Sequence, residues 1–366
     1  MRRIASQGCQ GCFEEQAAPL CTRPLCIAGP CSAETEAQVM ETARGLADAG
    51  VRIFRAGLWK PRTRPGSFEG VGSRGLAWLR RVKAETGMQV CTEVASEKHV
   101  RECLEAGVDM LWIGARTSAN PFLVQEIADA LDGADVPVWV KNPVNPDLGL
   151  WIGAVERLSG AGIRQIGVIH RGVSPASPLP YRNDPAWEMA VEMRSRFPHL
   201  PFLADPSHMG GDRRFLRELS QRALDLGLDG LMIESHCAPD DAWSDAAQQI
   251  TPEALRQLLS SLTVRESHSD DAGYRDGIDA LRARIDLIDE NLLKLLKERM
   301  DASRSIGLYK KNHKVAILQT ARWESLLRDR VERGAALGLS EAAVTALMRA
   351  IHEESVRVQT KECFTD

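Results

Sequence analysis

Side chains that commonly bind metal ions follow several short apolar runs that lie far apart in the sequence. Cys31, His208 and Glu234 each come just after such a run, and Asp245 follows Glu234 after a short interval. This mixture of sulfur, nitrogen and oxygen donors suits Mn²⁺, Fe²⁺, Co²⁺ or Zn²⁺ better than Mg²⁺ or Ca²⁺. Cys31 alone would be interpreted as a buried thiol, so the prediction of a divalent metal site depends on the whole set.

Basic residues occupy the ends of the same kind of run. The set consists of Arg55, Lys60, Arg62, Arg116, Lys141 and Arg171 in a chain whose formal net charge is -4. If these cations meet at one place, they repel one another unless an anion compensates, and phosphate and carboxylate are the natural candidates. Pairing of each cation with a surface carboxylate is the alternative, but it explains one arginine more readily than all of them.

Predicted strands and helices alternate regularly along the sequence, and their arrangement must position both sets of residues. Apolar runs suited to strands lie at residues 25–28, 52–55, 89–92, 110–113, 137–140, 165–169, 201–204 and 230–233. Stretches with helical periodicity lie at residues 36–49, 76–85, 99–106, 121–131, 151–160, 185–196 and 213–226. Strands that are apolar on both faces indicate a covered parallel sheet. This alternation predicts an α/β fold, a (β/α)8 TIM barrel over residues 24–262, which would bring the strand ends to one mouth.

The composition excludes several classes of protein. Hydrophobic residues make up 44% and charged residues 26%, which is typical of globular proteins. There is no long basic block and no apolar run of about 18 to 20 residues, so we expect neither a nucleic-acid partner nor a membrane span. A cytoplasmic location fits a chain with no apolar signal core. Residues 1–23 are expected to form a loose arm, in which Cys9 and Cys12 are a weak zinc signal.

The pattern changes after residue 262. Residues 263–277 are polar and are expected to form a linker. Residues 278–360 lack a strand signal and predict a small all-α domain of three helices, at about residues 278–311, 321–337 and 340–359, followed by a tail at 361–366.

The first of these helices carries a charge on its apolar stripe. The heptad that runs through Ile278, Ile285 and Leu292 continues to Arg299. A buried guanidinium needs an anionic partner, because a buried charge without one costs several kcal/mol. A coiled-coil dimer with a polar residue that fixes its register is the alternative.

The barrel motifs resemble those of a known family. The stretch 27–34 (IAGPCSAE), the Lys60-Pro61-Arg62-Thr63 loop, the segments 113–116 and 205–208, and the segment from Glu234 to Asp245 are similar to 3-deoxy-D-arabino-heptulosonate 7-phosphate (DAHP) synthase of type Iβ. The resemblance implies an aldol-like condensation of phosphoenolpyruvate with erythrose 4-phosphate, which releases phosphate.

The resemblance also implies roles for individual residues. The metal ligands would be Cys31, His208, Glu234 and Asp245, with Mn²⁺ expected and Fe²⁺, Co²⁺ or Zn²⁺ as alternatives. The ligands of phosphoenolpyruvate would be Arg55, Lys60, Arg116, Lys141 and Arg171. The sugar phosphate would be held by Arg62 and Thr63, with Asp205 nearby. Lys60 and Lys141 would stabilise developing negative charge, and either Glu93 or a metal-bound water could activate the attacking water.

A related synthase is the closest alternative for the barrel. The 3-deoxy-D-manno-octulosonate 8-phosphate synthases share the barrel and the first substrate, but normally carry Ala-Asn-Arg after the lysine of the second strand. This chain has Pro61-Arg62-Thr63 after Lys60, which favours the four-carbon sugar phosphate.

The helical segment resembles the all-helical chorismate mutases. Residues 281–289 (LRARIDLID) and 353–359 (EESVRVQ) carry the similarity. It implies an intertwined dimer in which Arg282 reaches the site of the second copy. The site would be completed by Arg299, Lys310, Arg322, Ser355 and Gln359, with Lys310 and Gln359 donating hydrogen bonds to the ether oxygen of chorismate. Relatives often have glutamate where this chain has Trp323.

Together the two resemblances predict a bifunctional enzyme that joins the first step of the shikimate pathway to the first step beyond chorismate. A second hypothesis makes the helical domain a regulatory and dimerising module with little catalysis, to which prephenate or chorismate binds and inhibits the barrel. A third keeps the barrel but changes the aldehyde substrate.

Overall fold

The computed structural model describes residues 24–60, 66, 68–265 and 271–364. The chain divides into two compact units, residues 1–267 and 268–366, and each is described by itself. The predicted arm at residues 1–23 and the predicted ligands Arg62 and Thr63 lie outside the described residues.

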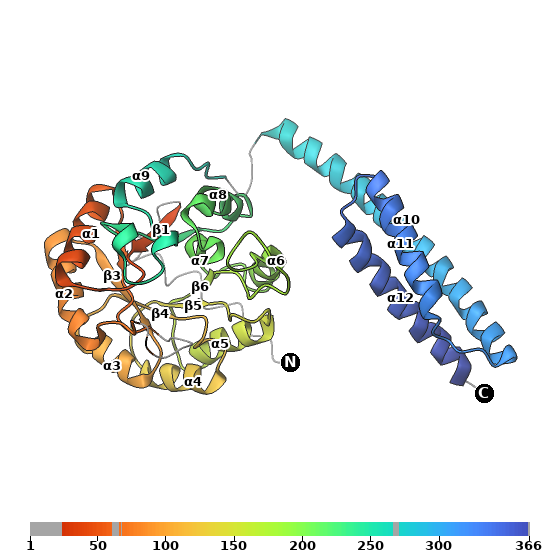
Figure 1. Ribbon diagram of the computed structural model, residues 1–366, viewed down its shortest axis with the longest axis horizontal. Coiled ribbons are helices and arrows are strands. Elements are labelled where there is room, and N and C mark those ends of the chain that lie inside the picture. Colours follow the sequence, from red (N-terminus) through yellow and green to blue (C-terminus); the bar gives the residue numbers. More distant parts are fainter. Residues whose placement is uncertain (1–23, 61–65, 67, 266–270, 365–366) are drawn as a thin grey trace. The chain divides into compact units, whose positions relative to one another are not determined.

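Within the described part of the first unit, eight parallel strands close into a barrel, as the sequence predicted (Figure 1). Each strand pairs with the next one in the chain, and β1 pairs with β8. The strands are β1 (Leu25–Gly29), β2 (Ile53–Arg55), β3 (Gln89–Val94), β4 (Met110–Ile113), β5 (Val138–Lys141), β6 (Ile166–His170), β7 (Phe202–Ala204) and β8 (Gly230–Glu234). Their carboxyl ends therefore meet at one mouth, where the predicted site residues lie.

Helices surround the barrel (Figure 1). Those that the sequence predicted are α1 (Glu36–Asp48), α2 (Gly75–Thr86), α3 (Glu97–Glu105), α4 (Pro121–Ala130), α5 (Leu148–Gly160), α6 (Trp187–Arg196) and α8 (Leu216–Asp225). Short additions that it missed are α7 (Pro206–Gly210), α9 (Pro252–Ser260) and the 3₁₀ turns η1 (Gly72–Arg74), η2 (Arg213–Phe215), η3 (Pro239–Asp241) and η4 (Ala246–Gln248). The start of α9 was recognisable, because the Thr251 side chain accepts a hydrogen bond from Ala254 N–H and Pro252 occupies the first turn.

Large side chains fill the inside of the barrel. Trp112 and Trp139 are at most 1% exposed and pack with Ile53, Met110 and other inward-facing residues. A Cβ atom at Gly167 would lie 2.3 Å from the Trp139 ring, so the missing side chain at Gly167 leaves room for the indole. Burying each such side chain stabilises the fold by roughly 1.5–3 kcal/mol. The residues at the mouth therefore lie next to a tightly packed barrel interior.

The second unit consists of α10 (Ala272–His313), α11 (Thr320–Ala336) and α12 (Glu341–Phe364). The first helix begins before Ile278, where the sequence placed its start, because the Asp271 side chain caps it by accepting from Tyr274 N–H. The polar composition of this turn hid the helix from a search for apolar periodicity.

One apolar stripe of α10 is only partly covered by the described residues. Leu281, Ile285, Ile288 and Leu292 are between 48% and 56% exposed. Their regular spacing places them on one face of the helix. A contiguous apolar row of this kind is typical of a surface that another protein segment covers.

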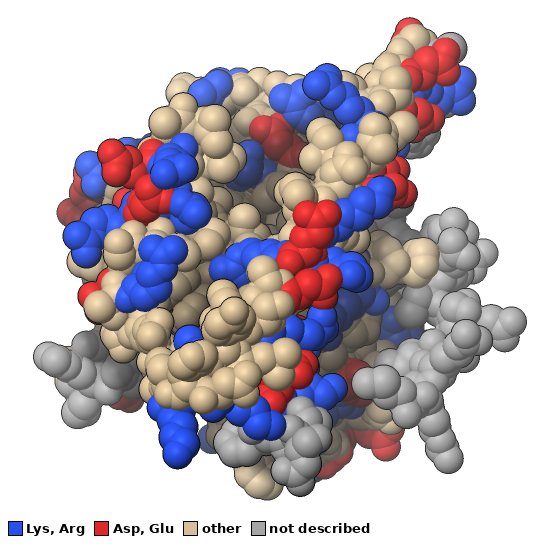
Figure 2. All heavy atoms as spheres, turned by 90° about the vertical axis from the view of Figure 1, so that its right-hand side faces the viewer, with Lys and Arg blue, Asp and Glu red and all other residues tan. Residues whose placement is uncertain are grey.

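The described helices include none whose length and apolar content would allow it to cross a membrane. The 46 basic and 50 acidic residues are nearly balanced in number. Figure 2 shows side chains of both signs close to one another on the face that it draws.

Candidate active site at the barrel mouth

Four predicted metal ligands lie on different elements of the barrel mouth. Cys31 follows β1, Glu234 is the last residue of β8, and His208 lies on α7, directly after β7. Asp245 lies in the loop after β8, where it precedes η4 in a left-handed conformation (φ 50°). The parallel strands thus bring together residues from both ends of the unit.

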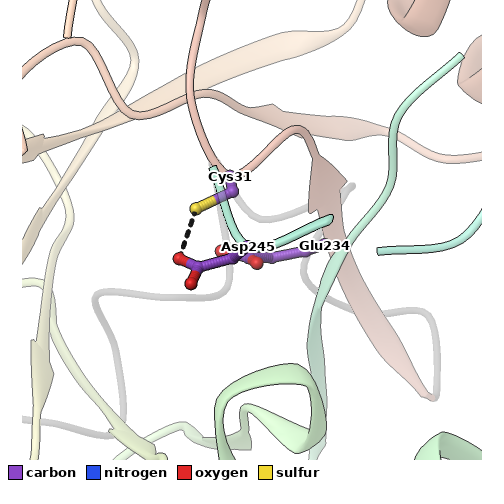
Figure 3. A group of neighbouring side chains, drawn as sticks. All are labelled: Cys31, Glu234 and Asp245. Carbon is purple, nitrogen blue, oxygen red and sulfur yellow. Dashed lines mark hydrogen bonds between the residues drawn. The ribbon is translucent and has the colours of Figure 1, made fainter. Parts of the chain in front are cut away.

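The ligand atoms of three of these residues form a close group. One atom each from Cys31, Glu234 and Asp245 lie within 4.8 Å of one another (Figure 3). Cys31 Sγ is 3.1 Å from Asp245 Oδ2, and His208 Nε2 is 3.7 Å from Glu234 Oε1. Side chains at these separations could hold one divalent ion with little rearrangement.

The protonation of His208 is fixed by its neighbour Asp205. His208 Nδ1 lies 2.8 Å from Asp205 Oδ2. Because that carboxylate can only accept, Nδ1 carries the proton and the lone pair remains on Nε2, which points toward Glu234. This carboxylate–histidine arrangement is common where histidine binds a metal ion.

Burial and neighbouring charges perturb the pKa values of all four groups. Burial, with a further contribution from Glu234, raises the pKa of the Cys31 thiol to about 12. Burial alone would raise the pKa values of Glu234 and Asp245, but neighbouring positive charge holds both below the usual range: that of His208 in its protonated form first, then that of Arg55 for Glu234 and of Arg182 for Asp245. Burial lowers the pKa of His208. At neutral pH the group therefore has two carboxylates, a neutral imidazole and a thiol that still carries its proton.

One buried oxygen indicates that the group suits a cation. Glu234 is 0% exposed, and its Oε1 accepts no hydrogen bond from the described residues, although Arg55 Nη2 is 3.2 Å away. A buried carboxylate oxygen without a donor is costly, by about 1–3 kcal/mol or more. A divalent ion beside Oε1, Cys31 Sγ and Asp245 Oδ2 would satisfy it, so the residues present fit a metal.

A cavity of about 190 Å³ opens beside this group and is lined mainly by polar side chains. Its basic lining residues are Lys60, Arg116, Lys141, Arg171 and Arg182. Lys60 Nζ is 3.0 Å from Cys31 Sγ, so one of these cations directly contacts a predicted metal ligand. An enclosed space with this lining suits a small anion such as a phosphate or a carboxylate.

Arg55 is not among the residues that line the cavity. It is 1% exposed, and its guanidinium carbon is 4.8 Å from the centre of the Trp112 ring. Its Nε and Nη1 atoms make no hydrogen bond to the described residues. A fully buried guanidinium with unsatisfied donors is prepared to bind an anion.

Asp205 takes part in more contacts than the sequence indicated. Its Oδ2 accepts from Lys141 Nζ at 2.6 Å as well as from His208, and its Oδ1 accepts from His208 N–H at 3.0 Å. It is 0% exposed. Asp205 therefore orients a predicted anion ligand and a predicted metal ligand at the same time.

Glu93 faces the cavity from β3. Trp112 Nε1–H donates to its Oε2 at 3.2 Å. A Cβ atom at Gly114 would lie 2.0 Å from Glu93 Oε1, so the glycine directly after the neighbouring strand β4 is needed for the carboxylate to occupy this place.

Four further residues at this site were missed from the sequence. Asn183 accepts from Arg171 Nη1 at 2.8 Å and donates to the backbone oxygen of His208 at 2.6 Å. Gln249 accepts from Cys31 N–H at 3.0 Å. Arg182 and Gln248 contact the acidic ligands. Three of them lie in loops and Gln248 ends the turn η4, all beside residues that carried stronger signals, and only Gln248 and Gln249 could have been suspected from their closeness to Asp245.

Two predicted site residues of the helical unit, Arg299 and Ser355, contact each other. Arg299 donates to the Ser355 hydroxyl, and Lys310 Nζ donates to Ile317 O. Gln359 is 8% exposed, and its Oε1 makes no hydrogen bond to the described residues. Burial, with a smaller contribution from Arg330, lowers the pKa of Arg299.

The other two predicted residues of this unit stand apart. Arg282 is exposed and pairs with Asp279 at 3.4 Å, and Arg322 is also exposed. Trp323 stacks on His352 with ring centres 4.0 Å apart.

Comparison with known proteins supports both parts of the chain. The model of the DAHP synthetase I family matches residues 21–268, and that of chorismate mutase type II matches residues 281–360. The phospho-2-dehydro-3-deoxyheptonate aldolase of Thermotoga maritima is 34% identical over 236 residues, which are 64% of this chain and 68% of the relative. A 2-dehydro-3-deoxyphosphooctonate aldolase of Legionella pneumophila is 28% identical over 268 residues, covering 66% of this chain and 90% of the relative.

A solved structure agrees with the barrel. The crystal structure of the Thermotoga maritima DAHP synthase superposes with a TM-score of 0.59 at 34% identity, over 64% of this chain and 67% of the other. Because the first family model matches more than half of the residues, the chain belongs to the DAHP synthetase I family, and a chorismate mutase type II domain follows its barrel.

Proposed function

We propose that the chain is a bifunctional enzyme of the shikimate pathway. Its barrel would condense phosphoenolpyruvate with erythrose 4-phosphate to DAHP and phosphate, and its helical domain would convert chorismate to prephenate. The observation that carries the first activity is the cavity in which basic side chains lie beside Cys31, Glu234 and Asp245.

The cations at the mouth would hold phosphoenolpyruvate through its carboxylate and phosphate. These are Arg55, Lys60, Arg116, Lys141 and Arg171. Fixed positive charges in a confined cavity stabilise the negative charge that develops on the departing phosphate, because they need no reorganisation during the reaction. Arg62 and Thr63, with Asp205 nearby, are proposed to bind the sugar phosphate.

Cys31, His208, Glu234 and Asp245 are proposed to hold one divalent ion, with Mn²⁺ preferred and Fe²⁺, Co²⁺ or Zn²⁺ as alternatives. The ion would supply Lewis-acid polarisation of the aldehyde oxygen. Glu93 would take a proton from the water that attacks C2. Its carboxylate is kept in place by the Trp112 indole and faces the same cavity as the cations.

The experiment that tests the barrel activity is the release of phosphate from phosphoenolpyruvate with two aldoses, each with and without EDTA. We expect release with erythrose 4-phosphate, its loss in EDTA and its recovery with Mn²⁺. Preference for arabinose 5-phosphate would favour the octulosonate reaction of the Legionella relative, and full activity in EDTA would contradict the metal role.

For the helical domain, Arg299, Lys310, Ser355 and Gln359 would bind chorismate, which is a dicarboxylate. The desolvated Arg299 and the unsatisfied Gln359 Oε1 support a polar ligand between α10 and α12. The reaction is intramolecular, so holding the reactive conformer and donating hydrogen bonds to the ether oxygen would suffice. Lys310→Ala should abolish formation of prephenate while metal content stays unchanged; a normal rate in this variant would contradict the assignment.

A homodimer through α10 would complete this site. The exposed stripe that includes Leu281 and Ile285 would be buried by the second copy, which would also supply Arg282, whereas Arg322 would come from the same chain as Arg299. Sedimentation of the full chain should show a dimer, and Ile285→Glu should dissociate it. A monomeric chain with full mutase activity would contradict this arrangement.

Feedback regulation is proposed as a further property of the two domains. Prephenate or chorismate bound in the helical domain would inhibit the synthase activity of the barrel. The enzyme is proposed to be cytoplasmic. A chain cut between residues 267 and 268 should then have a barrel that prephenate does not inhibit. An intact chain that is already insensitive would refute the idea.

A further inference from the structure

Two residues connect the carboxylates of Glu234 and Asp245. Gln248 Nε2 donates to Glu234 Oε2 at 2.7 Å. Gln248 Oε1 accepts from Arg182 Nη1 at 2.9 Å, and the same nitrogen donates to Asp245 Oδ1 at 2.9 Å. The result is a continuous chain of hydrogen bonds from one acidic ligand to the other.

The hydrogen bonds of the bridge engage one oxygen of each carboxylate and leave the second oxygen of each available to a metal ion. Glu234 Oε2 is taken by Gln248, whereas Oε1 accepts no hydrogen bond from the described residues. Asp245 Oδ1 is taken by Arg182, whereas Oδ2 faces Cys31 Sγ at 3.1 Å. Both carboxylates are therefore turned so that a single oxygen of each is presented to the metal site.

The orientation of the Gln248 amide follows from its partners. A guanidinium can only donate, so the amide oxygen of Gln248 must face Arg182. The amide nitrogen is then directed at Glu234, as the ligand role requires. Gln248 is 1% exposed, whereas the Arg182 side chain is 47% exposed, so the buried part of the bridge is neutral. Arg55 and Lys60 already bring positive charge to within 3.2 Å of Glu234 and 3.0 Å of Cys31, so a neutral donor at this position adds no further repulsion of a divalent cation.

The backbone holds both bridging residues in place. Arg182 N–H donates to Gly210 O at 3.1 Å, which ties its loop to the segment that carries His208. Gln248 N–H donates to Asp245 O at 3.2 Å within the turn η4. These backbone hydrogen bonds therefore hold the main chain from which both bridging side chains extend.

We propose that Gln248 is a positioning residue of the metal site: it holds Glu234 as a ligand through Oε1 alone, with its own amide oriented by Arg182. The inference rests on the proposed metal-dependent function and adds to it a residue outside the predicted ligand set. Partners that orient metal ligands in this way typically contribute 10–100-fold to metal affinity.

The test uses Gln248→Met, which keeps the length of the side chain but removes the donor. The metal-free full chain is titrated with Co²⁺, and the absorption band of cobalt bound to thiolate reports the ion at Cys31. We expect the variant to bind Co²⁺ about 10–100-fold more weakly. We also expect a change in the intensity of the ligand-field bands, because Glu234 would be free to bind through both oxygens.

Two further variants keep the result interpretable. Gln248→Asn retains a polar amide but is too short to reach Glu234, and it should show the same loss even if the methionine variant folds poorly. Gln221→Met removes a glutamine of α8 that donates to Asp225 Oδ1 and to Thr263 O. The Co²⁺ affinity of this variant should stay unchanged.

The outcomes distinguish an error in the role of Gln248 from an error in the metal site itself. Unchanged Co²⁺ affinity and spectra in both Gln248 variants, or an equal loss in Gln221→Met, would overturn the role of Gln248 while leaving the metal site intact. Absence of the thiolate band in the unmodified chain would contradict the metal site itself, and the role of Gln248 with it.

Discussion

Binding of a divalent ion at the barrel mouth should release about one proton per ion at neutral pH, and Cys31 is its source. A metal-bound cysteine is a thiolate, whereas burial and Glu234 raise the pKa of the free thiol to about 12. The other ligands should contribute little. The pKa values of Glu234 and Asp245 lie below their usual range, so both are already ionised, and burial lowers the pKa of His208, so it is already neutral.

The size of the effect follows from this count. If one proton leaves for each ion bound, the apparent affinity rises about tenfold for each pH unit between roughly pH 6.5 and 8, or about 1.4 kcal/mol per unit. The sign is fixed by the raised pKa: at higher pH, less free energy is needed to ionise Cys31. Lys60, 3.0 Å from the sulfur, reduces this cost but does not remove it, because the net shift is upward.

The assay is calorimetric titration of the metal-free chain with Mn²⁺ in buffers that differ in ionisation enthalpy, which counts the released protons directly. Cys31→Ser should bind more weakly and release close to none. The reasoning is refuted if the unmodified chain releases no proton, or if the serine variant releases as many as the unmodified chain.

Further predictions concern the floor and walls of the site. Trp139→Ala should lower the free energy of unfolding by about 3–5 kcal/mol in urea titration, because the indole fills the inside of the barrel and leaves a cavity; a loss below about 1 kcal/mol would contradict that packing. Asn183→Ala should raise the KM for phosphoenolpyruvate by about tenfold, since Arg171 loses a charge-assisted hydrogen bond. An unchanged KM would argue against a role of Arg171 in substrate binding. Gly114→Ala should lower kcat by roughly a hundredfold if Glu93 acts as a base, because the added methyl group would displace its carboxylate; an unaffected kcat would exclude that role.

The barrel was predictable because parallel strands covered on both sides need apolar residues at every position. Runs such as 110–113 and 230–233 meet that requirement and appear as strands with nearly the predicted limits. The beginning of α10 was not predictable in the same way. Its first turns are exposed and polar, and its start depends on the Asp271 cap rather than on a buried face.

The site was predictable only where its residues end a strand or carry distinctive chemistry. Cys31 and Glu234 occupy fixed places at the mouth, so topology alone brings them together. The contacts of Arg182 and Gln248 depend on how two loops fold against each other, and glutamine is too common a residue to signal a role. Their pairing is a property of the tertiary structure, for which a single sequence carries no local pattern.

Asp245 shows why such loop contacts matter. The other ligands stand on or directly beside strands and helices, whereas Asp245 lies in a loop with a left-handed backbone. For a residue other than glycine this conformation is unfavourable by roughly 1–2 kcal/mol, although aspartate tolerates it better than most. The ion pair with Arg182 at 2.9 Å and the hydrogen bond that Gln248 N–H makes to Asp245 O oppose that cost. The proposed ligand with the least support from the barrel is thus held by Arg182 and Gln248, the second of which also contacts Glu234, so the two carboxylates share one set of hydrogen-bond partners.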